Sequence, residues 1–111
     1  MLEHSLSESD VKRVDDLKLF FSNSSLSTRN IEDDFGSKGS QIISDFARSL
    51  SREERSYIAL LLEEIKWAME EMANGREDSR RIETLLDSLG NTARPVYRAL
   101  KSIESIKQIT V

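Results

Sequence analysis

The chain has 111 residues, with 16 basic and 20 acidic side chains and a formal net charge of −4. This length is enough for one domain with a modest hydrophobic core. There is no cysteine and only one histidine, His4, so the sequence excludes disulfides, thiolate metal sites and any triad that needs a histidine in the body of the chain. No apolar run approaches the roughly 20 residues of a membrane-spanning helix, and the first residues lack the pattern of a signal peptide. We therefore expect a cytoplasmic protein that does not enter a membrane.

Residues that break helices are scarce, since the chain has one proline and four glycines. No segment alternates β-branched and polar residues, as an exposed strand would. The sequence therefore predicts an all-α protein of four to five helices packed around a central helix at about 52–74. We expect residues 1–8 to form a flexible N-terminal tail and residues 9–108 to form a single helical domain.

The first half of the chain predicts two helical regions. The first helix begins after Ser7 or Ser9 and ends at 23–25, with one apolar stripe at Val11, Val14, Leu17 and Phe21. The region 28–50 also has helical spacing, but the glycine-containing stretch 36–40 interrupts it. We expect a short helix at 28–35, a hinge, and a helix at 39–50; one bent helix is the alternative.

The segment 52–74 gives the strongest helix prediction. Ser51 and Glu54 have the spacing of a capping box, and Gly75 supplies a stop. One face carries the residues that we expect in the core: Ile58, Leu61, Leu62, Ile65 and Met69. The neighbouring face is apolar too, with Tyr57, Leu60 and Trp67, so we expect partners around most of this helix.

Two further helices are expected at about 78–89, ending at Gly90, and at about 91–104, with Pro95 in the first turn. Across both helices, apolar residues alternate four and three apart, as in a coiled-coil seam: Ile82, Leu86, Leu89, Ala93, Val96, Leu100 and Ile103. Such a stripe requires a neighbouring surface. We therefore expect a homo-oligomer or an obligate partner binder, with candidate interface residues at Trp67, Val96, Leu100 and Ile103.

The segment 85–101 resembles the helix-turn-helix of transcription regulators. Gly90 stands where that motif has its turn glycine, and Val96 follows six residues later to pack the second helix. The resemblance implies a recognition helix on which Arg94, Arg98 and Lys101 face phosphates or base edges. An ordinary pair of amphipathic helices would have the same spacing, and the acidic charge of residues 1–75 disfavours DNA.

The remaining acidic residues do not have the arrangement of a catalytic site. The pairs 63–64 and 70–71 lie two helical turns apart, as on a solvated acidic face, and no histidine is near them. We expect no enzyme and no cofactor; metal-carboxylate hydrolysis is the only enzyme class left open. The sequence thus predicts a non-catalytic helical module for protein–protein interaction or regulation, such as an adaptor, an inhibitor or a small subunit. The alternative is a small DNA-binding regulator that uses a helix-turn-helix at about 82–101.

Overall fold

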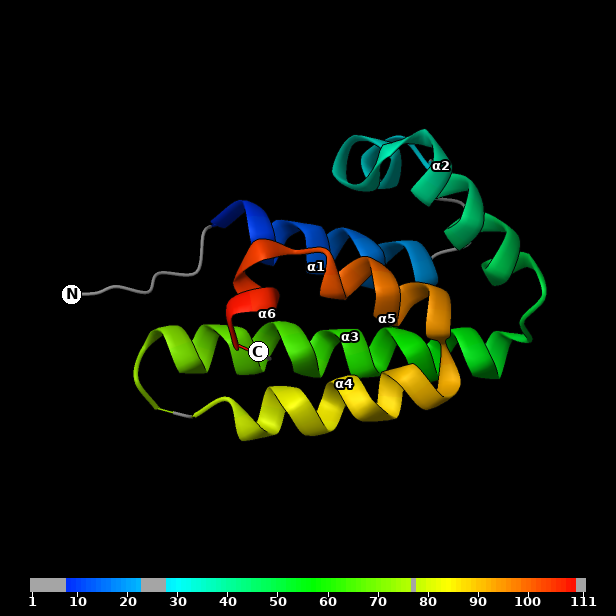
Figure 1. The fold of residues 1–111 in the computed structure, drawn as a ribbon. Helices are drawn as coiled ribbons and strands as arrows, with labels where there is room; N and C mark the ends of the chain where they lie inside the picture. Colours follow the sequence, from blue (N-terminus) through cyan, green and yellow to red (C-terminus); the bar gives the residue numbers. More distant parts are fainter. Residues whose placement is uncertain (1–7, 23–27, 77, 110–111) are drawn as a thin grey trace.

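Six α-helices contain almost all of the residues that the structure describes. A computed structural model of the chain describes residues 8–22, 28–76 and 78–109, and these ranges contain no strand. The helices are α1 (Glu8–Ser22), α2 (Arg29–Arg48), α3 (Arg52–Ala73), α4 (Arg80–Thr92), α5 (Arg94–Lys101) and α6 (Glu104–Ile109) (Figure 1). The all-α prediction is confirmed for these ranges. One helix more than predicted is present because the expected helix at 91–104 ends at Lys101, and α6 begins after a turn at 102–103.

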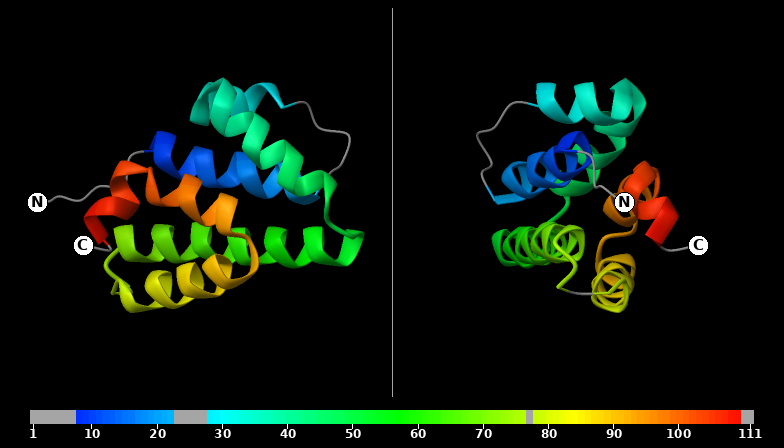
Figure 2. Two further views of the ribbon diagram at one scale, coloured as in Figure 1. Left: turned by 45° about the vertical axis from the view of Figure 1, so that its right-hand side comes forward. Right: turned by 90° about the vertical axis from the view of Figure 1, so that its left-hand side faces the viewer.

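The helices form a globule with extents of 41 × 25 × 22 Å. The helices α1 and α3 run antiparallel along its length, α4 lies against α3, and α5 doubles back from α4 (Figure 1). The helix α2 crosses above α1 and contacts α5 (Figure 2). The predicted arrangement around α3 is not shown, because α2 packs against α1 and α5 instead.

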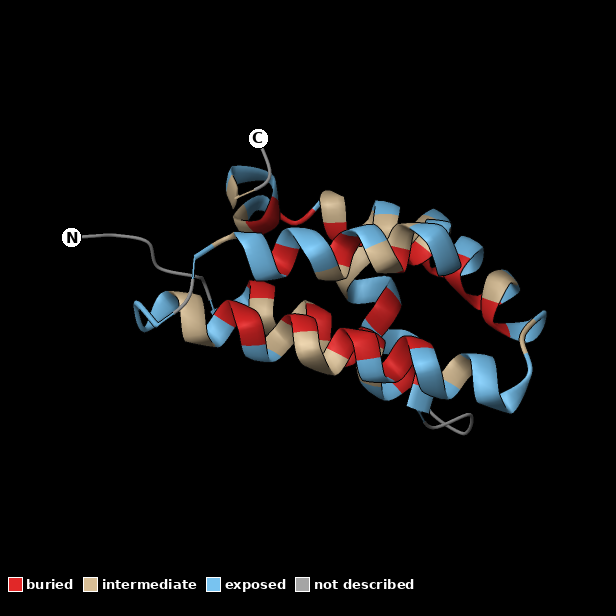
Figure 3. Cartoon of the chain, turned by 90° about the horizontal axis from the view of Figure 1, so that it is seen from below, coloured by how far each residue is buried: buried red, intermediate tan, exposed pale blue. Residues whose placement is uncertain are grey.

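The two faces of α3 have different environments. The five predicted core residues, Ile58, Leu61, Leu62, Ile65 and Met69, are all buried. Buried residues recur between exposed ones along the long helices (Figure 3). The neighbouring apolar face is not covered, since Tyr57, Leu60 and Trp67 are each about half exposed. Within the described chain, therefore, no helix packs over this side of α3.

Local sequence signals determine the ends of α3. The Ser51 hydroxyl oxygen accepts a hydrogen bond from the Glu54 amide at 3.1 Å, and the Glu54 carboxylate accepts one from the Ser51 amide at 2.8 Å. This is the predicted capping box. After the helix, Gly75 has a φ of 74°, in the left-handed region that glycine tolerates best.

The predicted hinge in 28–50 is a kink in α2 at Gly36. This residue has φ 85° and ψ 166°, a combination open essentially only to glycine, and helical structure lies on both sides of it. The segment of α2 before the kink packs Ile31 into the core, and the segment after it packs Ile43 and Ala47. The change of direction places both segments over the bundle.

The prediction that the helix at about 78–89 ends at Gly90 is wrong. Instead, α4 continues to Thr92, and the chain turns at Ala93, which has φ −143° and ψ 72°. The ring of Tyr97 lies beside Gly90, where an added Cβ would stand 3.4 Å from the ring, in ordinary van der Waals contact. Gly90 therefore lies inside α4 without ending the helix, and the packing of α5 does not depend on the missing side chain.

The apolar residues that alternate four and three apart in the predicted coiled-coil seam are buried within the chain itself. All seven of them are at most 3% exposed: Ile82, Leu86, Leu89, Ala93, Val96, Leu100 and Ile103. The neighbour that this stripe requires is therefore supplied by the other helices of the same chain.

Residues 1–7 of the predicted tail lie outside the described residues, whereas Glu8 already belongs to α1. Across the described ranges, none of the helices has the length and apolar character needed to cross a membrane.

Candidate functional site

A groove of about 400 Å³ lies between α2 and α5. Its lining comes from α2, from α5 and from the residue after α5: Phe35, Gly39, Ile42, Ile43, Arg94, Pro95, Arg98, Ala99 and Ser102. The volume falls within the range of about 300–1,000 Å³ that ligand-binding pockets occupy. The groove is therefore large enough to hold a portion of another molecule.

The floor of the groove is apolar because of the residue spacing on both helices. Residues 39, 42 and 43 share one face of α2 after the kink, where Ile43 is buried and Ile42 is 49% exposed, and Phe35 from before the kink lines the same groove. Gly39 has no side chain, and an added Cβ would stand 3.2 Å from that of Phe35. On α5 the floor is made of the small side chains of Pro95 and Ala99. Small residues at these positions keep the groove open.

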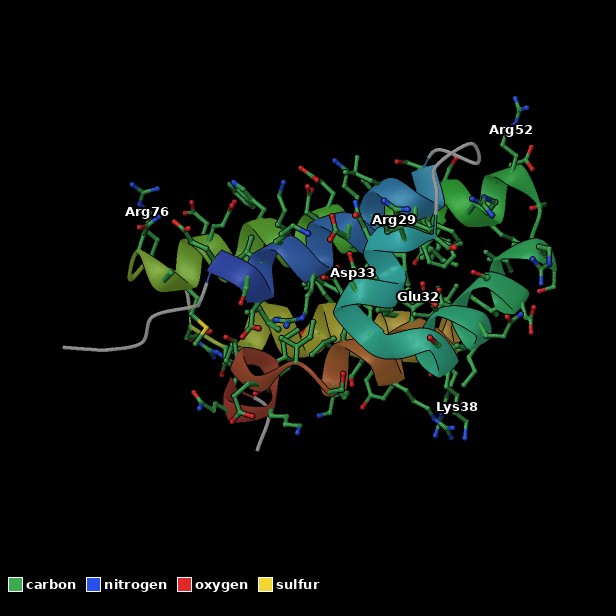
Figure 4. The ribbon with its side chains drawn as sticks, turned by 90° about the horizontal axis from the view of Figure 1, so that it is seen from above. Arg29, Glu32, Asp33, Lys38, Arg52 and Arg76 are labelled. Carbon is green, nitrogen blue, oxygen red and sulfur yellow. The ribbon has the colours of Figure 1, made fainter. Side chains whose placement is uncertain are left out.

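Two arginines line the edge of the groove. Arg94 and Arg98 lie one turn apart on α5, and both are exposed. Neither guanidinium group has an ion pair or a hydrogen bond with a described residue. Lys38, which precedes Gly39 on α2, projects on the side where α5 lies (Figure 4). The groove thus combines an apolar floor with unpaired positive charge.

Elsewhere, most basic side chains of the chain are already paired. Lys66 on α3 contacts Asp15 on α1 at 3.2 Å, and Arg81 on α4 contacts Glu64 on α3 at 3.2 Å. Because acidic side chains outnumber basic ones in this chain, most basic side chains can form an ion pair. Arg94 and Arg98 have no ion pair with a described residue, and what distinguishes the groove is that these two unpaired charges lie beside an apolar surface.

The residues predicted for DNA contact do not all share one environment. Arg94 and Arg98 face outward together, as the helical spacing predicts. Lys101 is partly buried, and its ammonium group lies 5.9 Å from the ring centroid of Tyr97, outside the groove lining. The structure therefore brings two of the three basic residues together.

The predicted interface residues lie in two different places. Val96, Leu100 and Ile103 are buried in the core of the chain, so a partner could reach them only if α5 were displaced. Trp67 is 51% exposed, and it lies on α3 rather than at the groove.

Sequence reasoning missed the contribution of Phe35 and Ile42 to the groove. Ile42 lies next to the buried Ile43, so the segment of α2 after the kink has more apolar surface than one buried stripe requires. That excess is the signal that was available in the sequence. The pairing of this surface with α5 is tertiary, since more than 50 residues separate the two sides of the groove.

A pair of interacting carboxyl groups joins α1 and α2: Asp16 belongs to α1 and Asp34 to α2. Asp16 is 8% exposed and accepts a hydrogen bond from Lys12 at 2.8 Å. Burial, followed by the interaction with Asp16, raises the pKa of Asp34 to about 6, although Lys12 and Arg13 oppose this shift. Asp34 precedes Phe35 of the groove. Among the described residues there is no cluster of three or more side chains suited to hold a metal ion.

A comparison with protein-family models finds no match to this chain, and comparisons with curated proteins and with solved structures find no significant similarity. The functional assignment therefore rests on the geometry of the groove.

Proposed function

We propose that this chain is a protein–protein interaction module whose α2–α5 groove binds an acidic amphipathic helix. The observation that carries this proposal is an apolar groove of about 400 Å³ edged by Arg94 and Arg98, neither paired with a described residue. An adaptor, an inhibitor or a small subunit of an assembly would each act through such a groove.

The two sides of the groove supply different contributions to the binding energy. Apolar side chains of the ligand lose contact with water against Phe35 and Ile42, at about 25 cal/mol per Å² buried. Arg94 and Arg98 lie one helical turn apart, about 6 Å along the axis, which matches carboxylates three or four residues apart on a helix. Bidentate arginine–carboxylate pairs then fix the orientation of the ligand.

The DNA-binding alternative has less support. A recognition helix must protrude to enter the major groove, but α2 lies beside the exposed face of α5, where Phe35 and Ile42 line the same groove as the arginines. The chain also turns at Ala93 rather than at Gly90, so the turn of the resembled motif is missing. The acidic net charge adds repulsion of phosphates.

The proposal is tested by a charge-swap experiment. The probe is a fluorescein-labelled, helix-stabilised peptide with leucines at i, i+3 and i+7 and glutamates between them, and its lysine counterpart is the comparison. Binding is followed by fluorescence anisotropy, for the wild type and for a variant carrying Arg94→Glu and Arg98→Glu. Arg52→Glu is the matched control, because Arg52 is an exposed arginine on α3, away from the groove (Figure 4).

We expect the wild type and the Arg52→Glu control to prefer the glutamate peptide. The double variant should lose at least about tenfold in affinity for it and prefer the lysine peptide. Equal binding of both peptides to both proteins would overturn the proposal. So would salt-dependent binding of random duplex DNA that Arg98→Glu abolishes, because that result would favour the DNA-binding alternative.

A further inference from the structure

The outward face of α3 has the pattern of a helix that binds in a groove. Tyr57, Leu60 and Trp67 are 47%, 55% and 51% exposed, and they occupy positions i, i+3 and i+10 of one helix. Large apolar anchors at helical spacing are what a helix presents to a hydrophobic groove. Tyr57 and Leu60 lie about one turn apart, and Trp67 lies two turns after Leu60 on the same side; large apolar side chains gathered on one exposed face are typical of a surface that binds a partner.

The charges around this stripe are mainly negative. Arg52–Ala73 contains six glutamates, and Glu53 and Glu70, near the two ends of the stripe, have no ion pair with a described residue. Glu63 and Glu64 lie between the anchors and pair only with Lys18 and Lys66 or with Arg81 at the helix margins. The outward face of α3 is thus an acidic amphipathic helix, the ligand chemistry that the α2–α5 groove requires.

The two surfaces lie on opposite sides of the molecule. Viewed end-on, α3 forms an outer corner between α1 and α4, whereas α2 and α5 lie across the bundle from it (Figure 2). A chain therefore cannot bind its own α3 in its own groove. Two different surfaces that meet between identical chains form a head-to-tail contact, not a two-fold symmetric one.

We propose that the outward face of α3, anchored by Leu60 and Trp67, binds in the α2–α5 groove of a second copy of this chain. This inference rests on the proposed function, because it uses the same groove. In the contact, Leu60 and Trp67 cover the floor formed by Phe35 and Ile42, and glutamates of α3 pair with Arg94 and Arg98. In a pair of copies, one chain keeps a free α3 face and the other keeps a free groove. Further copies can therefore bind at both ends of the pair.

The test uses two variants that each remove one side of the contact. One carries Leu60→Ser and Trp67→Ser and keeps the groove; the other carries Arg94→Glu and Arg98→Glu and keeps the α3 face. All four positions are exposed, and circular dichroism melting checks that both variants remain folded. Sedimentation velocity is measured from micromolar to millimolar concentration. Leu19→Ser, at an exposed leucine of α1, is the matched control.

We expect the wild type and the control to associate with increasing concentration, and each double variant alone to sediment as a monomer. Their equimolar mixture should form a one-to-one heterodimer and nothing larger, because only one intact groove and one intact face meet. Trp67 is the only tryptophan of the chain, so its emission should shift to shorter wavelength as the wild type associates.

A wild type that is monomeric throughout the concentration range would overturn the inference. Association of either double variant alone would overturn it too, as would a mixture that remains monomeric. These outcomes are distinct from failure of the proposed function: if the glutamate peptide still binds in an arginine-dependent manner, the groove function stands and only the self-association falls.

Discussion

The guanidinium group of Arg55 on α3 donates a hydrogen bond to the backbone carbonyl oxygen of Phe20 on α1, 3.0 Å away. It donates another to the carbonyl oxygen of Ala47 on α2 at 3.3 Å, and it lies 5.8 Å from the ring centroids of Phe20 and Phe21. Both carbonyl groups belong to the last turn of their helices, and that of Ala47 also accepts a hydrogen bond from the Leu50 amide at 3.2 Å. One side chain thus joins the ends of two helices to a third.

Replacement of Arg55 by lysine should therefore destabilise the fold. A single ammonium group cannot reproduce the planar fork that bonds two carbonyl oxygens. We expect Arg55→Lys to lower the free energy of unfolding by about 1–2 kcal/mol in urea titrations. Arg52→Lys, one turn earlier and exposed, should change it by less than about 0.5 kcal/mol. Equal effects at the two positions would show that the contacts of Arg55 contribute nothing.

Neighbouring leucines on α3 provide a test of its two faces. Leu62 is fully buried, and Leu60 is 55% exposed. We expect Leu62→Ala to cost about 2–5 kcal/mol of stability and Leu60→Ala less than about 1 kcal/mol. Thermal and urea unfolding of the two variants give both values. Similar losses would mean that the outward face of α3 is covered in solution, and a concentration series would then show whether a second copy covers it.

The pKa of Asp34 predicts how stability depends on pH. Because burial and Asp16 raise it from 3.8 to about 6, the folded chain holds a proton between these values that the unfolded chain has lost. The contribution of Asp34 to stability therefore falls as pH rises from about 4 to about 6, and it stays low at pH 7.

Asp34→Asn should remove this contribution to the pH dependence. The variant should be more stable than the wild type at pH 7, and the difference should shrink as pH falls towards 4. Urea unfolding at several pH values measures both effects. Asp33→Asn, at the exposed neighbouring carboxylate, should leave the slope unchanged. A wild-type slope that persists in Asp34→Asn would place the titrating group elsewhere.

Gly36→Ala should destabilise α2 at its kink. A side chain at φ 85° and ψ 166° is strained, at about 1–3 kcal/mol, even though no atom lies within 4 Å of an added Cβ. Lys38→Ala, in the helical segment that follows the kink, serves as the control for stability. Phe35 lies next to the kink, so Gly36→Ala should also weaken binding of the glutamate peptide. Unchanged stability would mean that the kink is absent in solution.

The features that sequence predicted well are those determined by nearby residues. The capping box of α3, its buried face and the hinge at Gly36 all follow from residues within a few positions of one another. That α4 continues past Gly90 to Thr92 could not be predicted, because it depends on the packing of the whole chain rather than on nearby residues. For the same reason, the apolar stripe that includes Val96 indicated that a neighbouring surface must cover it, but it could not indicate that other helices of the same chain supply that surface.

In the candidate site, too, sequence predicted the features that depend on nearby residues and not those that depend on tertiary packing. Helical spacing correctly put Arg94 and Arg98 on an exposed face, since that needs only the geometry of one helix. It could not indicate that Phe35 and Ile42 lie beside them, because the kink in α2 and the reversal at Ala93 together bring these segments into contact. The resemblance to a helix-turn-helix is local too, and it predicted the turn at Gly90, whereas the chain turns at Ala93.

The reversal at Ala93 has a consequence for how the chain avoids exchanging segments with its neighbours. Residues 80–101 keep one apolar seam through the break, so a single straight helix of about 33 Å would present the same seam without a core of its own. Two copies could then fill each other's cores with α5, as in domain swapping. Pro95 opposes this, because a proline inside such a helix costs about 3 kcal/mol and its ring clashes with the preceding turn. By making the straight form unfavourable, Pro95 commits each chain to completing its own core.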